Sequence, residues 1–350
     1  MPTSNLINQV TDWYQTNIAV SQIWGVIGFI TSLLVALFAV YLVVRALFKT
    51  VGAISNWMAS RRRKSQQGYG IGISPLKGPQ GKAQTKALMA ELNDHLAAFS
   101  FGAPFEVLRA PTLRAQGSKG LRAHATQWLE TASTDLILWG GRESGKLSPL
   151  EVEVLSLEGS LSPREAVHSE GMMPIITPAN RETTGPVAAY LVARALQPGL
   201  ATAAAFKKEK LAPVADILFT CLQDRENLPE RTQLTLETDY CAMALHIGGQ
   251  EHLLRVADMR RERLSGTETL SFDIEVPARV DLGRALLGLS NIKFDPVRVR
   301  EAMDHLKVAI ELLRADPNIR LAQATSAAVQ QGQAMLENRK RFSVTGGNGI

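Results

Sequence analysis

The sequence is poor in the side chains that build disulfide frameworks, zinc sites and nucleophilic active sites. Cys221 and Cys241 are the only cysteines among 350 residues, and no C-x-x-C motif occurs. The six histidines are scattered, without a pair at ligand spacing, and spacing suggests no Ser/His/Asp or Cys/His set. We therefore expect two reduced thiols, no metal, no cofactor and no enzymatic activity.

The first 22 residues contain no lysine or arginine, and an uncharged apolar run follows them at residues 23–44. This run reaches the roughly 20 residues that a helix needs to cross a bilayer. A cleaved signal peptide would begin with a basic region, so the run predicts a permanent transmembrane helix. The basic residues that follow it are Arg45, Lys49, Arg61, Arg62, Arg63 and Lys64. By the positive-inside rule they predict a single-pass inner-membrane protein with its N-terminus outside and its C-terminal part in the cytoplasm.

Residues 45–67 also carry apolar side chains at helical spacing between the basic residues, which predicts an amphipathic juxtamembrane segment near the lipid surface. The basic residues there would contact anionic headgroups, each contributing on the order of 1 kcal/mol. Alternatively they only set the topology, as every single-span protein requires. The sequence leaves both interpretations open.

One segment comes close to a nucleotide-binding P-loop. In LILWGGRESGKLS, residues 136–148, the pattern G-x-x-x-x-G-K runs from Gly140 to Lys146, but Leu147 replaces the hydroxyl residue that binds magnesium. Residues 150–157 then alternate between apolar and polar, which is typical of a strand and not of the helix whose amides would hold phosphate. We therefore predict a hairpin loop in which Lys146 is solvated.

Residues 68–200 alternate between strand and helix patterns. Strands are expected at 70–74, 105–108, 135–139 and 150–157, and helices from about residue 82, at 120–131 and at 186–196. Residues 159–182 are expected to be an excursion with one short strand. The predicted fold class is α+β: a transmembrane helix, a small βαβαββ domain, and an all-α region of helical hairpins.

The stretches GIGISPLKG, FEVLRAP and TDLILWGGRESGKLSPLEVEVL, separated by amphipathic helices, resemble the amino-terminal domain of TolB and the related CsgG- and FlgO-like domains. The resemblance covers about residues 68–200 and implies a small α/β domain with no catalytic site to transfer. In cytoplasmic relatives such a domain often precedes tetratricopeptide-type helices. TolB itself is periplasmic, whereas the charges of this sequence indicate the cytoplasm, and we follow the charges.

From residue 201 the pattern is helical, with helices expected at 214–223, 231–247, 251–264, 279–292, 296–314 and 319–337. Residues 281–318 resemble one degenerate tetratricopeptide repeat, in which Ala302, Leu306 and Ala309 match the second helix. These residues are candidates for partner binding, because repeat surfaces bind proteins. Alternatively the helices only pack on the first domain. A disordered tail is expected at 338–350.

These features favour a membrane-anchored cytoplasmic scaffold or adaptor that recruits other proteins through its helical repeat-like region. The alternative is a lipid-binding protein that organises or senses membrane curvature through basic helical faces. The clusters Lys207-Lys208-Lys210 and Arg260-Arg261-Arg263 could add contacts to a membrane or an acidic partner, although solvated helix faces explain them more simply. The net charge of +5 is partly concentrated beside the apolar run. We therefore expect anionic lipids and proteins as partners, but no nucleic acid. A homo-oligomer is compatible with these features.

Overall fold

The computed structural model describes residues 7–18, 31, 34–35, 37–45, 68–78, 80–113, 117–141, 150–158, 165–203, 205–266, 270–315 and 318–345. The chain divides into two compact units, Met1–Arg61 and Arg62–Ile350. In the first unit residues 7–18 and 37–45 are helical, and the predicted span at 23–44 lies partly outside the described residues. Within the described part of the chain, no helix combines the length and the apolar character that crossing a membrane requires.

The second unit begins with a five-stranded mixed sheet in the order β2-β1-β3-β4-β5. Its strands are β1 (Tyr69–Ile73), β2 (Phe105–Arg109), β3 (Leu136–Gly141), β4 (Leu150–Glu158) and β5 (Glu165–Met173). Strand β1 runs parallel to β2 and to β3, while β3-β4 and β4-β5 are antiparallel. The four strands expected from the sequence are confirmed. The short strand expected within 159–182 is instead a nine-residue strand that pairs along the whole of β4.

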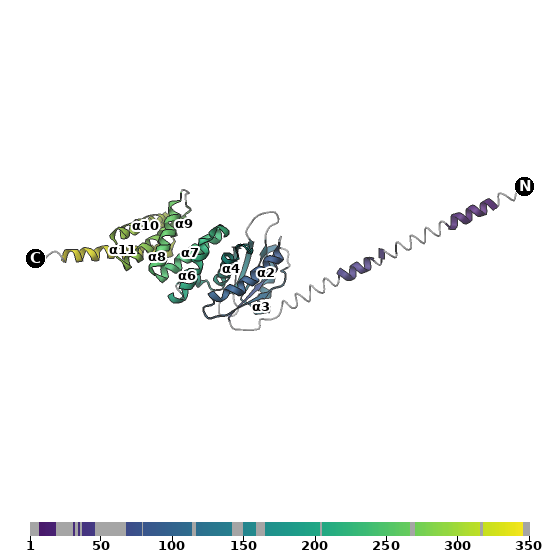
Figure 1. Ribbon diagram of the computed structural model, residues 1–350, viewed down its shortest axis with the longest axis horizontal. Coiled ribbons are helices and arrows are strands. Elements are labelled where there is room, and N and C mark those ends of the chain that lie inside the picture. Colours follow the sequence, from purple (N-terminus) through teal and green to yellow (C-terminus); the bar gives the residue numbers. More distant parts are fainter. Residues whose placement is uncertain are drawn as a thin grey trace. The chain divides into compact units, whose positions relative to one another are not determined.

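Helices cover both faces of this sheet. Helix α2 (Gly81–His95), with the short 3₁₀ turn η1 (Leu96–Phe99), lies beside α4 (Arg181–Leu196) on one face (Figure 1). Helix α3 (Gly117–Ala132) covers the other. Because side chains alternate along a strand, Leu136 and Leu138 enter the core with α2 and α4, whereas Ile137 and Trp139 join the core under α3.

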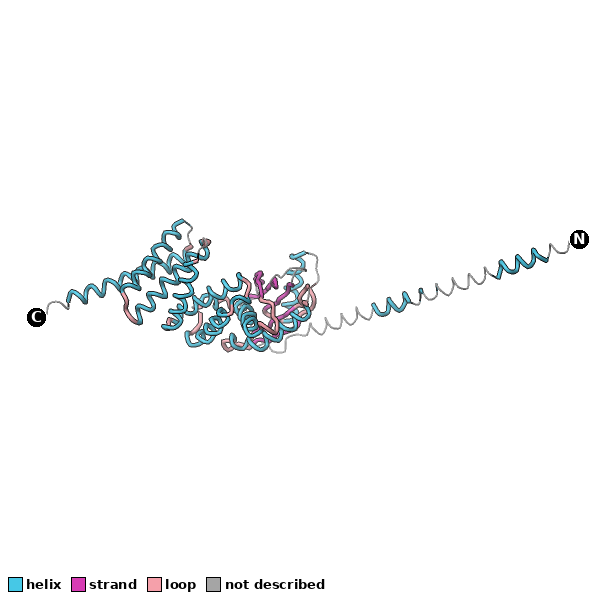
Figure 2. The backbone as a smooth tube through the Cα atoms, turned by 45° about the horizontal axis from the view of Figure 1, so that its top comes forward, coloured by secondary structure: helices cyan, strands magenta, loops and turns pink. Residues whose placement is uncertain are grey.

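The remaining chain is helical, as expected, and Figure 2 shows the strands confined to the first part of the unit. The helices are α5 (Gly199–Thr202), α6 (Lys208–Gln223), α7 (Glu230–Ile247), α8 (Gln250–Ser265), α9 (Phe272–Ile292), α10 (Pro296–Ala315) and α11 (Ile319–Thr345), with a 3₁₀ turn η2 (Arg225–Asn227). Helix α9 begins before the predicted residue 279. Its first turn contains Asp273 and Glu275, whose charges complement the helix dipole there.

Helix α11 corrects the predicted tail. The helix continues past Glu337 to Thr345, so residues 338–345 are helical rather than a disordered tail. The sequence from 333 to 345 contains neither proline nor glycine, and nothing in it stops a helix before Gly346-Gly347. Residues 346–350 lie outside the described part of the chain.

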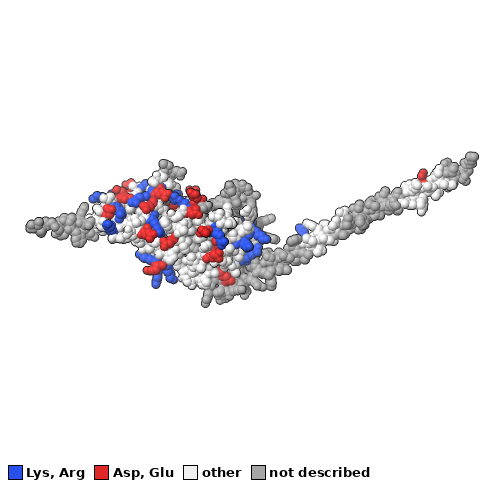
Figure 3. All heavy atoms as spheres, in the orientation of Figure 1, with Lys and Arg blue, Asp and Glu red and all other residues white. Residues whose placement is uncertain are grey.

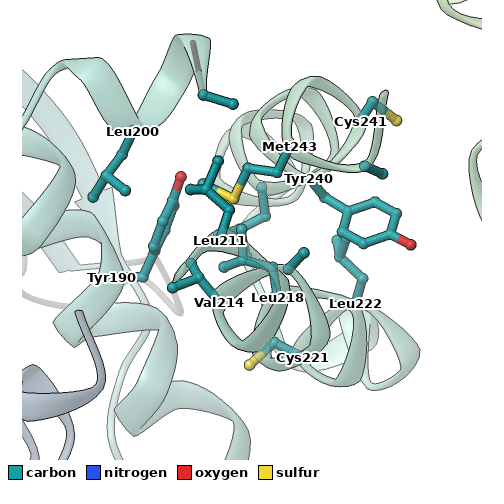
Figure 4. Packing of buried hydrophobic residues seen from close by; sticks show 14 of the residues in the cluster. Tyr190, Leu200, Leu211, Val214, Leu218, Cys221, Leu222, Tyr240, Cys241 and Met243 are labelled. Carbon is teal, nitrogen blue, oxygen red and sulfur yellow. The ribbon is translucent and has the colours of Figure 1, made fainter. Parts of the chain in front are cut away.

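A buried carboxylate joins the sheet domain to the helices. Asp239 of α7 is 1% exposed and accepts a hydrogen bond from the Tyr190 hydroxyl of α4 at 2.8 Å. Arg194, also on α4, forms an ion pair with the same carboxylate. Burial and the Asp239 carboxylate raise the pKa of Tyr190 well above its ordinary value, so the phenol stays protonated and donates. Around this link a single apolar core continues from the sheet into α6 and α7 (Figure 4).

We predict that Gly72→Ala destabilises the protein, because a Cβ at Gly72 would lie 2.2 Å from the Trp128 ring of α3. Overpacking of this kind costs about 1–3 kcal/mol, measurable as a lower free energy of unfolding in urea. The control is Gly266→Ala, where the nearest atom would be 3.6 Å away. Trp128→Phe should recover part of the loss in a double-mutant cycle. Equal stability of the two alanine variants would contradict this packing.

Candidate partner-binding groove

The residues that the tetratricopeptide resemblance assigned to partner binding are buried. Ala302, Leu306 and Ala309 are each 0% exposed, so this prediction is wrong. Their face of α10 packs against α9, where a Cβ at Gly283 would lie 2.6 Å from the Leu306 side chain. Small and apolar residues at repeat spacing here hold one helix against the next, which leaves no surface for a partner.

The predicted membrane-surface residues fall in the first unit or at its border. Arg45 is the last described residue of the helix at 37–45, and its side chain is exposed. Lys49, Arg61, Arg62, Arg63 and Lys64 lie outside the described residues, as does Lys146 of the P-loop-like segment. The element after that segment is a strand, β4, paired antiparallel with β3, as the sequence predicted.

A groove of about 480 Å³ opens on the helical region. It lies between the α7–α8 turn, the end of α9 and the middle of α11, and its lining residues are Leu245, Gly248, Leu253, Arg284, Gly288, Asn291, Ile292, Ala324, Ala327, Ala328 and Gln331. Gly248 ends α7 with a φ of +76°, a conformation that favours glycine, and lets α8 start at Gln250. This tight turn places the start of α8 beside the end of α7.

Small side chains keep the groove open. A Cβ at Gly288 of α9 would lie 2.9 Å from the Leu253 side chain, so glycine permits the close approach of α8. On α11 the groove is lined by Ala324, Ala327 and Ala328, which are too short to fill the space. The floor is mostly apolar, and Ile292 at the rim is 51% exposed.

The polar groups of the groove are few. Arg284 is its single charged lining residue; it is exposed and forms no ion pair with any described residue. Asn291 and Gln331 contribute amides that can donate and accept hydrogen bonds. This lining offers no nucleophile and no acid–base pair. It can hold an apolar side chain next to a carboxylate or another anionic group.

The three arginines of the α8 cluster each form an ion pair, and one of them is buried. Arg260 is 4% exposed, and its Nη2 lies 2.8 Å from Asp281 Oδ2, while Arg263 and Glu237 are 2.7 Å apart. Arg261 pairs with Glu301 at 2.8 Å. The interpretation of this cluster as a solvated face is therefore wrong for Arg260. Positive and negative side chains are interspersed over the visible face of the helical region in Figure 3.

The two cysteines are free and buried. Burial raises the pKa of Cys241 to about 12 and that of Cys221 to about 11. Since the thiolate is the nucleophile, both side chains are inert near neutral pH. Figure 4 shows the two sulfurs on different helices, pointing away from each other.

Among the described residues, no group of three or more His, Cys, Asp or Glu side chains is placed to hold a metal ion. Comparison of the chain with protein-family models, curated proteins and solved structures gives no match. The shape of the groove, its lining residues and the charge of Arg284 therefore have to indicate what it binds. Sequence reasoning missed Arg284, Asn291 and Gln331; the signal present was the cluster of small residues at Gly288 and on α11.

The cysteines give a pH-dependent prediction. In the unfolded chain a thiol ionises at about pH 8.5, whereas the folded thiols resist ionisation up to about pH 11 and 12. The folded state therefore binds more protons above pH 9, and stability falls as pH rises, by at most about 1.4 kcal/mol per pH unit for each thiol. Urea unfolding of the wild type and of a Cys221→Ala/Cys241→Ala variant should show a shallower fall for the variant. Identical slopes would contradict the burial of both thiols.

Proposed function

We propose that this chain is a membrane-held adaptor whose helical region binds a protein partner in the groove between α8, α9 and α11. The observation that carries the proposal is the open apolar groove of about 480 Å³ with Arg284 as its single charged side chain. A segment that presents an apolar side chain and a neighbouring carboxylate complements both features. The proposal assigns no reaction to the protein.

The membrane part of the proposal rests on the sequence. The uncharged run at 23–44 is long enough for a spanning helix, and the basic residues after it favour a cytoplasmic C-terminal unit at the bacterial inner membrane. An anchor of this kind confines the groove to the membrane surface. A partner that binds the groove is then held at the membrane, as expected of a scaffold.

The alternative, in which basic helical faces bind lipid, receives less support from the arrangement of charge. The arginines of α8 face carboxylates of α7, α9 and α10, so their charge is largely neutralised within the protein. Anionic lipid would have to compete with these internal ion pairs. Lipid contact by the basic residues near the apolar run remains part of the anchor.

The groove is tested by blocking it. A photoreactive residue replacing Asn291 should crosslink to a protein in native membranes, and Ala327→Arg, which puts a long side chain on the lining of the groove, should reduce this crosslinking at least about tenfold. The matched control is Ala334→Arg, an exposed alanine of the same helix outside the groove. Arg284→Glu should also weaken capture, whereas Arg284→Lys keeps the charge and should retain it.

Two results would count against the groove. Crosslinking from position 291 that survives Ala327→Arg would show that the partner touches this surface without entering the groove, and crosslinks to lipid instead of protein would favour the lipid-binding alternative. The free energy of unfolding of each variant, measured in urea, separates lost binding from lost folding.

The orientation is tested separately with protease. When protease is added to intact spheroplasts, the unit from Arg62 onward should stay intact, and it should be digested once the membrane is permeabilised. A soluble cytoplasmic protein serves as the control for leakage. Removal of this unit from intact spheroplasts would reverse the topology and the cytoplasmic assignment.

A further inference from the structure

Strand β2 forms an edge of the sheet, and one side of its backbone is unpaired with any described strand. The Tyr69 N–H donates to the Pro104 carbonyl at 2.8 Å, and the Ala110 N–H donates to the Ile73 carbonyl at 2.9 Å. These bonds fix which residues of β2 face β1. Because N–H and C=O directions alternate along a strand, Phe105, Val107 and Arg109 direct theirs away from the sheet. Such a row of donors and acceptors is a template for another strand.

An apolar hollow of about 260 Å³ lies directly beside this edge. Its lining comes from the end of α2, from η1 and from β2: Leu92, Asn93, Leu96, Ala97, Ser100, Pro104, Phe105 and Val107. The Phe105 and Val107 side chains, which are half-buried, pack against the core on this face. The edge therefore combines an apolar surface with backbone groups that pair with no described strand. At the opposite edge of the sheet, α7 packs near β5.

We propose that the occupant of this edge is the β2 strand of a second copy of the chain, running antiparallel about a two-fold axis at Val107. In this register Val107 faces Val107 of the second copy, and Phe105 faces its Arg109. Each of these residues directs its N–H and C=O toward the other copy, so every pair closes two hydrogen bonds. The two sheets then become one continuous sheet. A two-fold contact requires only that the surface complement itself.

The side chains of the strand suit this register. Arg109 of one copy is exposed and would lie across from Phe105 of the other, so that its aliphatic stem covers the aromatic ring. The two copies of Arg109 would therefore not face each other. The guanidinium would also approach the end of α2 and η1, where the helix carbonyls carry partial negative charge. On the other face Glu106 would lie across from Leu108, which avoids a direct pairing of like charges. A shift of the axis to Arg109 would lose this complementarity.

The register predicts which engineered cysteines crosslink. Directly opposed residues of a hydrogen-bonded pair have Cα atoms about 5.5 Å apart, within the roughly 4.4–6.8 Å that a disulfide spans. Val107→Cys in the full chain should therefore give a disulfide-linked dimer on oxidation in detergent. Leu108→Cys is the matched control: it is equally half-buried, but its copies would be diagonal neighbours about 7–8 Å apart. Phe105→Cys mixed with Arg109→Cys should crosslink, whereas either variant alone should not.

Hydrogen exchange tests the same contact in the unaltered protein. The amides of Phe105, Val107 and Arg109 should exchange at least about tenfold more slowly at high than at low protein concentration, while those of Glu106 and Leu108, already bonded to β1, should not change. Sedimentation should show a dimer over the same range. A monomer at all concentrations, or equal crosslinking of Val107→Cys and Leu108→Cys, would overturn the proposal. Protection of the edge without a dimer would assign it to another chain and overturn the second copy as the occupant.

Discussion

The buried carboxylate of Asp239 is the constraint on which the second unit depends. A carboxylate with 1% exposure is costly unless it is paired and hydrogen-bonded, and Tyr190 and Arg194 satisfy both conditions from a single helix, α4. Both donors lie on one face of α4, separated by about one helical turn. The carboxylate therefore fixes the rotation of α4 as well as its distance from α7. Removal of either donor would leave a buried charge only partly satisfied.

A second set of contacts fixes α4 against α2, the helix that packs on the sheet. Gly185 of α4 lies so close to α2 that a Cβ there would be 2.4 Å from Glu91 Oε2. Glu91 is itself buried and pairs with Arg181 of α4 at 2.8 Å, while His95 lies 3.4 Å from its other oxygen. Helix α2 is thus held by α4, and the end of α2 forms the hollow beside β2. The sheet is connected to the helices through the contacts of α2 with α4 and of α4 with α7. These contacts agree with the grouping of residues from Arg62 to Ile350 in one compact unit.

The sequence predicted the positions of the strands and helices well, but it did not predict which helix faces pack inside the protein and which could bind a partner. Strands β1 and β3 are marked by short apolar runs that are buried on both faces, β4 by alternation and the helices by helical spacing, and each of these signals is local. Strand β5 reads EAVHSEGMM and lacks that alternation, so its pairing with β4 depends on backbone bonds that composition does not reveal. The spacing of Ala302, Leu306 and Ala309 was detected correctly, but periodicity reports burial and cannot distinguish a packing face from a partner face.

The groove could not have been found in the same way, because its walls come from residues as far apart in the chain as Leu245 and Gln331. Nothing local marks Arg284 as a groove residue. The same holds for the link between Tyr190 and Asp239, which joins residues on two helices with no shared motif. Long-range placement of polar groups is set by the tertiary packing, so it becomes visible only in the folded structure.

A small groove and a paired sheet edge would act together. A space of about 480 Å³ accommodates one or two side chains of a partner, which limits the affinity of a single groove. Two copies joined at β2 would present two grooves held by the same rigid framework. If a partner is itself multivalent, the second binding event becomes intramolecular, and avidity can then exceed single-site affinity by roughly 10²–10⁴ without a new contact. Dimerisation would therefore convert a weak groove into an effective recruiting surface, while a monovalent partner would still exchange rapidly.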